Sequence, residues 1–67
     1  MEWMIIDMKQ PLSDAVQKAL EYHYQKYGKH PNILEYSDKL SACPNVDGVE
    51  STPVHIPANI LLIGVKI

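Results

Sequence analysis

The sequence predicts a small α/β (α+β) fold, in which a mixed sheet of three to four strands carries one main amphipathic helix on one face. Three observations indicate this fold. The final ten residues, 58–67, are mostly apolar on both alternating faces, as expected of a central strand. Residues 11–27 repeat apolar side chains with a helical period. Strand-like segments elsewhere are bounded by proline, asparagine and glycine. The predicted order is β-α-β-(short α)-β-β.

The first half of the chain predicts one strand and one helix. Glu2–Met8 is expected to be a strand with apolar side chains on both faces. Pro11 suits the first turn of a helix that runs to Tyr27, because its missing N–H is not needed there. Gly28 is expected to form a left-handed cap, and Pro31 prevents the helix from continuing.

The second half predicts three strands and a single turn of helix. Asn32–Tyr36 is the second strand, and Asp38–Ala42 is expected to be a short helix after it. Val49–Ile56 is extended, but Pro53 restricts it to a sheet edge or a bulge. Ala58–Ile67 contains the final strand.

Two pairings follow from this order of elements. Parallel pairing of the first strand with the second would make the long helix a right-handed crossover. The last two extended segments fit an antiparallel pair, and the sheet would then be mixed. Gly64 interrupts the final strand, which indicates a bulge or the close approach of another backbone.

Size and composition limit the classes of protein. The 67 residues form a single domain, 1–67, with a thin core, and the one cysteine excludes an internal disulfide. The net charge is −2, and all six basic residues are lysines, which argues against nucleic acid as a partner. We expect no membrane partner, because no apolar run reaches the length of a membrane span. The acidic N-terminal segment does not resemble a signal peptide, so a cytoplasmic location is expected.

Few residues suggest chemistry. His23 lies on the apolar face of the helix, where a core histidine bonded to a backbone carbonyl or a tyrosine is favoured over a catalytic or ligating one. Cys43 lacks the local signature of a nucleophilic cysteine. Its spacing from His23, His30 and His55 is not that of a zinc site. We therefore predict no catalytic, cofactor-binding or metal-binding residues and no cofactor.

The strongest functional indication is apolar surface in excess of the cover available. One helix covers one face of a sheet, whereas the final strand is apolar on both. We predict that one face of this strand belongs to the core and that the other lies at an interface. The candidate interface residues are Trp3, Ile60, Leu62, Leu61, Ile63, Val65 and Ile67.

These residues predict a non-catalytic protein-interaction or regulatory domain that forms a homo-oligomer or docks on a larger protein. Its small size would suit an accessory protein of a phage or mobile element. The alternative is a minimal enzyme subunit or small-ligand binder, with a site built across a dimer interface around His23, Cys43 and the tyrosines.

Overall fold

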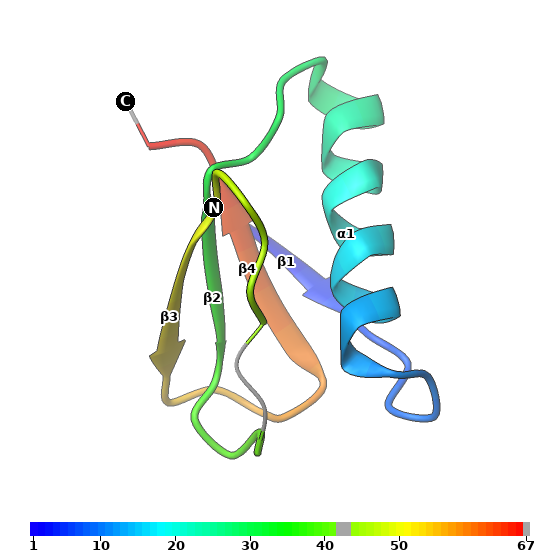
Figure 1. The fold of residues 1–67 in the computed structure, drawn as a ribbon, viewed down its shortest axis with the longest axis vertical. Coiled ribbons are helices and arrows are strands. Elements are labelled where there is room, and N and C mark those ends of the chain that lie inside the picture. Colours follow the sequence, from blue (N-terminus) through cyan, green and yellow to red (C-terminus); the bar gives the residue numbers. More distant parts are fainter. Residues whose placement is uncertain (42–43, 67) are drawn as a thin grey trace.

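The computed structural model describes residues 1–41 and 44–66. Its elements are β1 (Glu2–Ile5), α1 (Leu12–Tyr27), β2 (Ile33–Ser37), β3 (Glu50–Val54) and β4 (Ile60–Gly64). The four strands form one mixed sheet, and the helix follows the first strand (Figure 1). The predicted fold class is confirmed.

The order of the strands in the sheet is β1-β4-β2-β3. The final strand is therefore central, as predicted, and it runs antiparallel to both β1 and β2. The two expected pairings were wrong: β4 separates β1 from β2, and β3 pairs with β2 in parallel instead of with β4. Apolar side chains on both faces of β4 suit a position between two strands, whereas Pro53 confines β3 to an edge.

The predicted short helix was also wrong over its described residues. Asp38 and Lys39 form a turn. The Ser37 Oγ accepts a hydrogen bond from the Lys39 N–H at 3.1 Å, and the Ser37 carbonyl accepts one from the Leu40 N–H at 3.2 Å. A serine that bonds the backbone two residues ahead favours a turn over continued helix. Ala42, the last residue of that prediction, lies outside the described residues.

The C-terminal end of helix α1 is the one that the sequence predicts, whereas Pro11, expected in the first turn, is the N-cap with ψ 141°. The helix begins after Pro11 and ends at Gly28, which adopts a left-handed conformation with φ 71° and ψ 13°. The Gly28 N–H donates to the Tyr24 carbonyl at 2.7 Å. Glycine tolerates this conformation because it has no Cβ.

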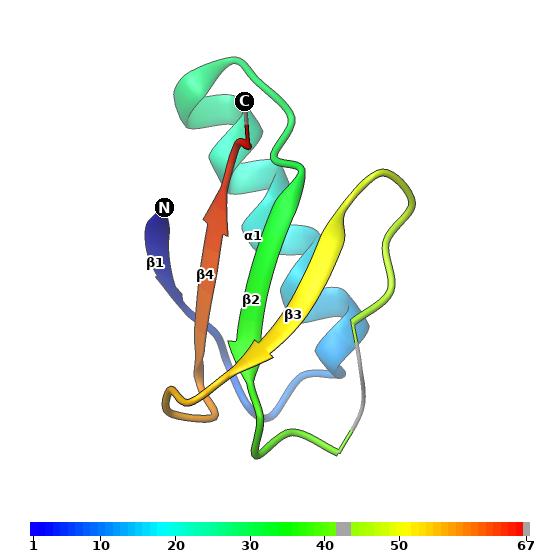
Figure 2. The same cartoon turned by 90° about the vertical axis from the view of Figure 1, so that its left-hand side faces the viewer.

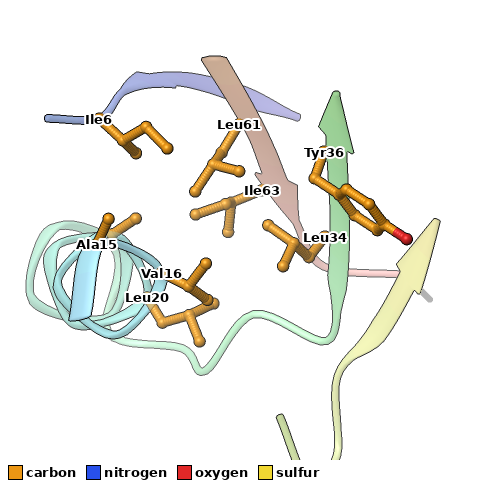
Figure 3. Close-up of a cluster of buried hydrophobic side chains, with 9 residues drawn as sticks. Ile6, Ala15, Val16, Leu20, Leu34, Tyr36, Leu61 and Ile63 are labelled. Atoms are coloured by element: carbon orange, nitrogen blue, oxygen red, sulfur yellow. The ribbon is translucent and has the colours of Figure 1, made fainter. Parts of the chain in front are cut away.

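The core lies between α1 and one face of the sheet (Figure 3). Apolar side chains of β2 and β4 point toward the helix, and Ile6 adds to them from the end of β1. Leu40, Val46 and Val49 pack against the same core from the connection 38–49, which joins the parallel strands β2 and β3. The buried cluster consists of Ile6, Ala15, Val16, Ala19, Leu20, Leu34, Tyr36, Leu61 and Ile63.

Candidate interface on the open face of the sheet

Alternation along β4 divides its side chains between two environments. Leu61 and Ile63 are fully buried in the core on the helix side. Ile60 and Leu62 must point to the opposite side, because successive side chains of a strand alternate. We call this side the open face. In Figure 2 it is turned toward the viewer, with α1 behind the sheet.

Strand register adds further side chains to the open face. Trp3 lies opposite Leu62, and Ile5 lies opposite Ile60, so all four share one side of the sheet. Ile33, which is opposite Gly64, extends this apolar area onto β2. We define the apolar patch as Trp3, Ile5, Ile33, Ile60 and Leu62.

The apolar patch is exposed only at its β1 end, since Ile60 is buried and Ile33 and Leu62 are partly buried. Trp3 is 65% exposed and Ile5 is 80% exposed. In the described part of the chain, both the helix and the packed residues of the 38–49 connection lie on the other side of the sheet. Contiguous apolar surface of this kind marks interaction sites more often than a single exposed residue does.

The structure thereby chooses between the two faces that the sequence left open. Leu61 and Ile63 belong to the core, so they are not surface residues of the described fold. Of the other candidates, Trp3, Ile60 and Leu62 lie in the apolar patch. Val65 follows the end of β4 and is exposed, and Ile67 lies outside the described residues. Ile5, the most exposed large apolar side chain of residues 1–41 and 44–66, was missed, although its alternation with Trp3 in the sequence was visible.

Charge divides the open face into two halves. Glu35 lies opposite Leu62 on one side and Thr52 on the other, so its side chain joins the open face at β2. Glu50 on β3 shares this side and lies 3.9 Å from the Lys66 Nζ. The half formed by β1 and β4 is apolar, whereas the half formed by β2 and β3 carries the carboxylates of Glu35 and Glu50 beside Ile33.

Gly64 meets the expectation of close approach. A Cβ at this position would lie 3.0 Å from the Cγ of Met1 and 3.4 Å from its Cα. The backbone and side chain of Met1, the residue before β1, therefore lie close against Gly64 at the end of β4.

A polar cluster joins β1 to α1 on the helix side of the sheet. One carboxylate oxygen of Glu2 accepts a hydrogen bond from the Lys26 Nζ at 2.6 Å and another from the Tyr27 hydroxyl at 3.2 Å. The Lys26 ammonium lowers the pKa of the Glu2 carboxyl, and the Tyr27 hydroxyl adds to this effect against partial desolvation. The carboxylate in turn raises the pKa of Lys26. This cluster attaches the edge strand to the helix.

The lowered pKa of Glu2 predicts a loss of stability in acid. A carboxyl whose pKa is lower in the folded state stabilises the fold above its unfolded pKa, here the ordinary 4.5, and loses this contribution as the pH falls through the folded pKa. We expect Glu2→Gln to unfold at lower urea concentration than the parent at pH 7, and the difference to shrink toward pH 3. A difference that stays constant with pH would contradict an ionised Glu2 as the stabilising group.

His23 lies in the core, as predicted, but without the predicted hydrogen bond at one nitrogen. The side chain is buried, and its ring contacts the Tyr27 ring at 4.7 Å between centroids. Its Nδ1 has no hydrogen-bond partner among the described residues, and the second carboxylate oxygen of Glu2 is likewise buried without one there. Both residues line a shallow cavity of about 340 Å³ beside Met1 and Gly64. An unpaired buried polar atom costs about 1–3 kcal/mol of stability.

Replacing His23 with leucine therefore tests whether the buried imidazole lowers the free energy of unfolding. We expect His23→Leu to raise the free energy of unfolding by about 1 kcal/mol. The substitution removes an unsatisfied polar atom and puts an apolar side chain of similar size in its place. Urea unfolding followed by circular dichroism measures the change. A loss of more than about 2 kcal/mol would instead mean that Nδ1 is hydrogen-bonded in solution, for example to an ordered water.

The remaining histidines have separate surroundings. The His30 ring stacks on Tyr24 at 4.1 Å beside a groove of about 500 Å³ between α1 and the 46–49 segment. His55 is exposed, and its Nδ1 lies 3.7 Å from a carboxylate oxygen of Asp38. Within residues 1–41 and 44–66, no three His, Cys, Asp or Glu residues are grouped to hold a metal ion. Cys43 lies outside the described residues.

The fold is a small α+β domain in which a single long helix packs on one face of a four-stranded sheet. Comparison with protein-family models, with curated proteins and with solved structures gave no match to this chain. Over the described residues, no helix has both the length and the apolar character needed to cross a lipid bilayer.

Proposed function

We propose that this protein is a small non-catalytic protein-interaction domain, which self-associates or docks on a larger protein through the open face of its sheet. The observation that carries the proposal is the apolar patch, with Trp3 and Ile5 mostly exposed on the side of the sheet away from the helix. A chain of this size has a thin core, so burying the patch in a complex would add to its stability.

The alternative, a ligand or catalytic site built across the same interface, has less support. His23 is buried on the helix side of the sheet, whereas the apolar patch lies on the other side. A partner seated on the open face would therefore not complete a site around His23. Three exposed tyrosines of α1 likewise lie on the side of the sheet away from the apolar patch: Tyr22, Tyr24 and Tyr27.

Sedimentation over a wide concentration range, together with the fluorescence of a dye that binds apolar surface, tests the proposal. We expect the parent protein to associate, or to bind the dye as a monomer. Leu62→Lys places a charge at the centre of the apolar patch and is expected to weaken both signals. Thr52→Lys is the matched control, because Thr52 is exposed on the same face but lies on β3, outside the patch.

Two further measurements keep the test decisive. Circular dichroism shows whether Leu62→Lys is folded, and Trp3→Ser provides a second variant at a side chain whose exposure makes the substitution mild. A parent protein that stays monomeric at high concentration and binds no dye would overturn the proposal.

The proposal includes a cytoplasmic location. Its support is the single cysteine, since small secreted domains usually depend on several disulfides.

A further inference from the structure

We infer that β1 of a second copy of this chain pairs in antiparallel orientation with the outer edge of β1. The two four-stranded sheets would then form one continuous eight-stranded sheet. This inference rests on the proposed function and names one mode of self-association. Within the described part of the chain, no strand pairs with the outer edge of β1, which carries exposed apolar side chains and permits a register with two-fold symmetry.

The two edges of the sheet differ in how well they are protected. The Glu50 N–H of β3 donates to the Asn32 carbonyl, and the Val54 carbonyl of β3 accepts from the Asp38 N–H. The backbone N–H and C=O groups of residues 50, 52 and 54 therefore face β2. The outward residues are Ser51 and Pro53, and proline has no N–H to donate. Proline protects natural sheet edges in this way. Strand β1 contains neither proline nor lysine.

The free groups of β1 belong to Trp3 and Ile5. The Ile6 N–H donates to the Asn59 carbonyl at 2.9 Å, which faces the backbone groups of Ile6 toward the β4 side. Backbone groups of a strand alternate in direction, so those of Met4 face β4 as well. The N–H and C=O groups of Trp3 and Ile5 then point away from the sheet.

One antiparallel register uses all of these groups. If Met4 lies opposite Met4 of the second copy, then Trp3 lies opposite Ile5 of the second copy, and Ile5 lies opposite its Trp3. Each of these two pairs exchanges both backbone hydrogen bonds, as hydrogen-bonded antiparallel pairs do. A register shifted by two residues would place Trp3 opposite Trp3 of the second copy, or Ile5 opposite Ile5. The other of these two residues would then have no partner in β1 of the second copy.

The side chains favour the same register. Trp3 and Ile5 are the two most exposed large apolar side chains among the described residues, and the register places them in contact as aromatic–aliphatic cross-strand pairs. No like charges are opposed, because Glu2 would face Ile6 of the second copy. The Glu2 carboxylate is also already held by Lys26 on the helix.

Pairing at this edge would bring the two apolar patches side by side across the two-fold axis. The same interaction is isologous, so it closes at two copies and leaves only the proline-containing edges of β3 free.

Amide hydrogen exchange followed by NMR tests the inference directly. In the dimer, we expect the amides of Trp3 and Ile5 to exchange at least tenfold more slowly than in dilute, monomeric samples. The Ser51 amide is the matched control: it faces outward on the opposite edge and is expected to show no change. Trp3 and Ile5 amides that exchange equally fast in a demonstrated dimer would overturn the edge pairing and leave the proposed function intact.

A pair of proline variants supports the exchange measurement. Ile5→Pro removes an outward N–H but none that β4 uses, so we expect a folded protein whose dimer dissociates about tenfold more readily. Ser51→Pro makes the equivalent change on the opposite edge and is expected to leave the dimer unchanged. A dimer that withstands Ile5→Pro but is lost in Leu62→Lys would show packing through the open face instead of pairing at the edge.

The remaining outcomes separate the two proposals. A parent protein that is monomeric but binds the apolar dye would overturn the edge pairing, while docking on a larger protein would stand. A monomer without dye binding would overturn both.

Discussion

Replacing Leu61 with alanine is expected to lower the free energy of unfolding by about 3 kcal/mol, within the range of about 2–5 kcal/mol for such changes in a core. Leu61 is fully buried at the centre of β4 and belongs to the cluster that joins the sheet to α1. A scaffold of this size rarely gains more than about 3–5 kcal/mol from its core. Urea unfolding by circular dichroism at 25 °C should find a substantial fraction of Leu61→Ala unfolded without denaturant.

The neighbouring residue is the matched control. Leu62→Ala removes the same atoms from the next position of the same strand, but on the open face, where the side chain is only partly buried. We expect it to cost about 1–2 kcal/mol in dilute, monomeric samples, less than Leu61→Ala, since part of the Leu62 side chain contacts water. Equal losses for the two variants would mean that the open face is covered within the monomer.

Enlarging Ala19 to leucine is expected to lower the free energy of unfolding by about 1–3 kcal/mol. Ala19 is buried on the face of α1 that packs against the sheet, together with Ala15. Two small side chains there let the helix lie close to the strands, and added methyl and methylene groups would push the two layers apart. Thermal and urea unfolding measure the loss.

The control for this change is Gln25→Leu, which introduces the same side chain at an exposed position of the same helix. Leucine and glutamine have similar helix propensities, so we expect a change within about 0.5 kcal/mol. Tolerance of leucine at Ala19 would indicate that the helix and the sheet are loosely packed.

Several features followed from the sequence because their causes are local. Pro11 and Gly28 limit α1 through the missing N–H of one and the conformational freedom of the other. Pro53 placed its segment at an edge for a similar reason. The apolar run of 58–67 indicated a central strand because its side chains are apolar on both faces, which is typical of strands with little contact with water.

Other features depended on contacts between residues far apart in the chain. Alternation alone made the Ile60/Leu62 and Leu61/Ile63 faces of β4 equally apolar, and only the position of α1 assigned the second face to the core. The insertion of β4 between β1 and β2 likewise has no local signal. Strand order is decided by which arrangement buries the most apolar surface while satisfying the backbone of every strand, and that comparison requires the whole fold.

The polar cluster shows the same dependence. Glu2 and Lys26 are 24 residues apart, and nothing in their spacing suggests a contact. They meet because β1 lies beside the helix once the sheet has formed. The sequence by itself therefore determined the helix, the central strand and the surplus of apolar surface. The tertiary structure decided that the exposed part of this surplus, Trp3 and Ile5, lies on the open face at the outer edge of β1, because α1 packs on the opposite side of the sheet.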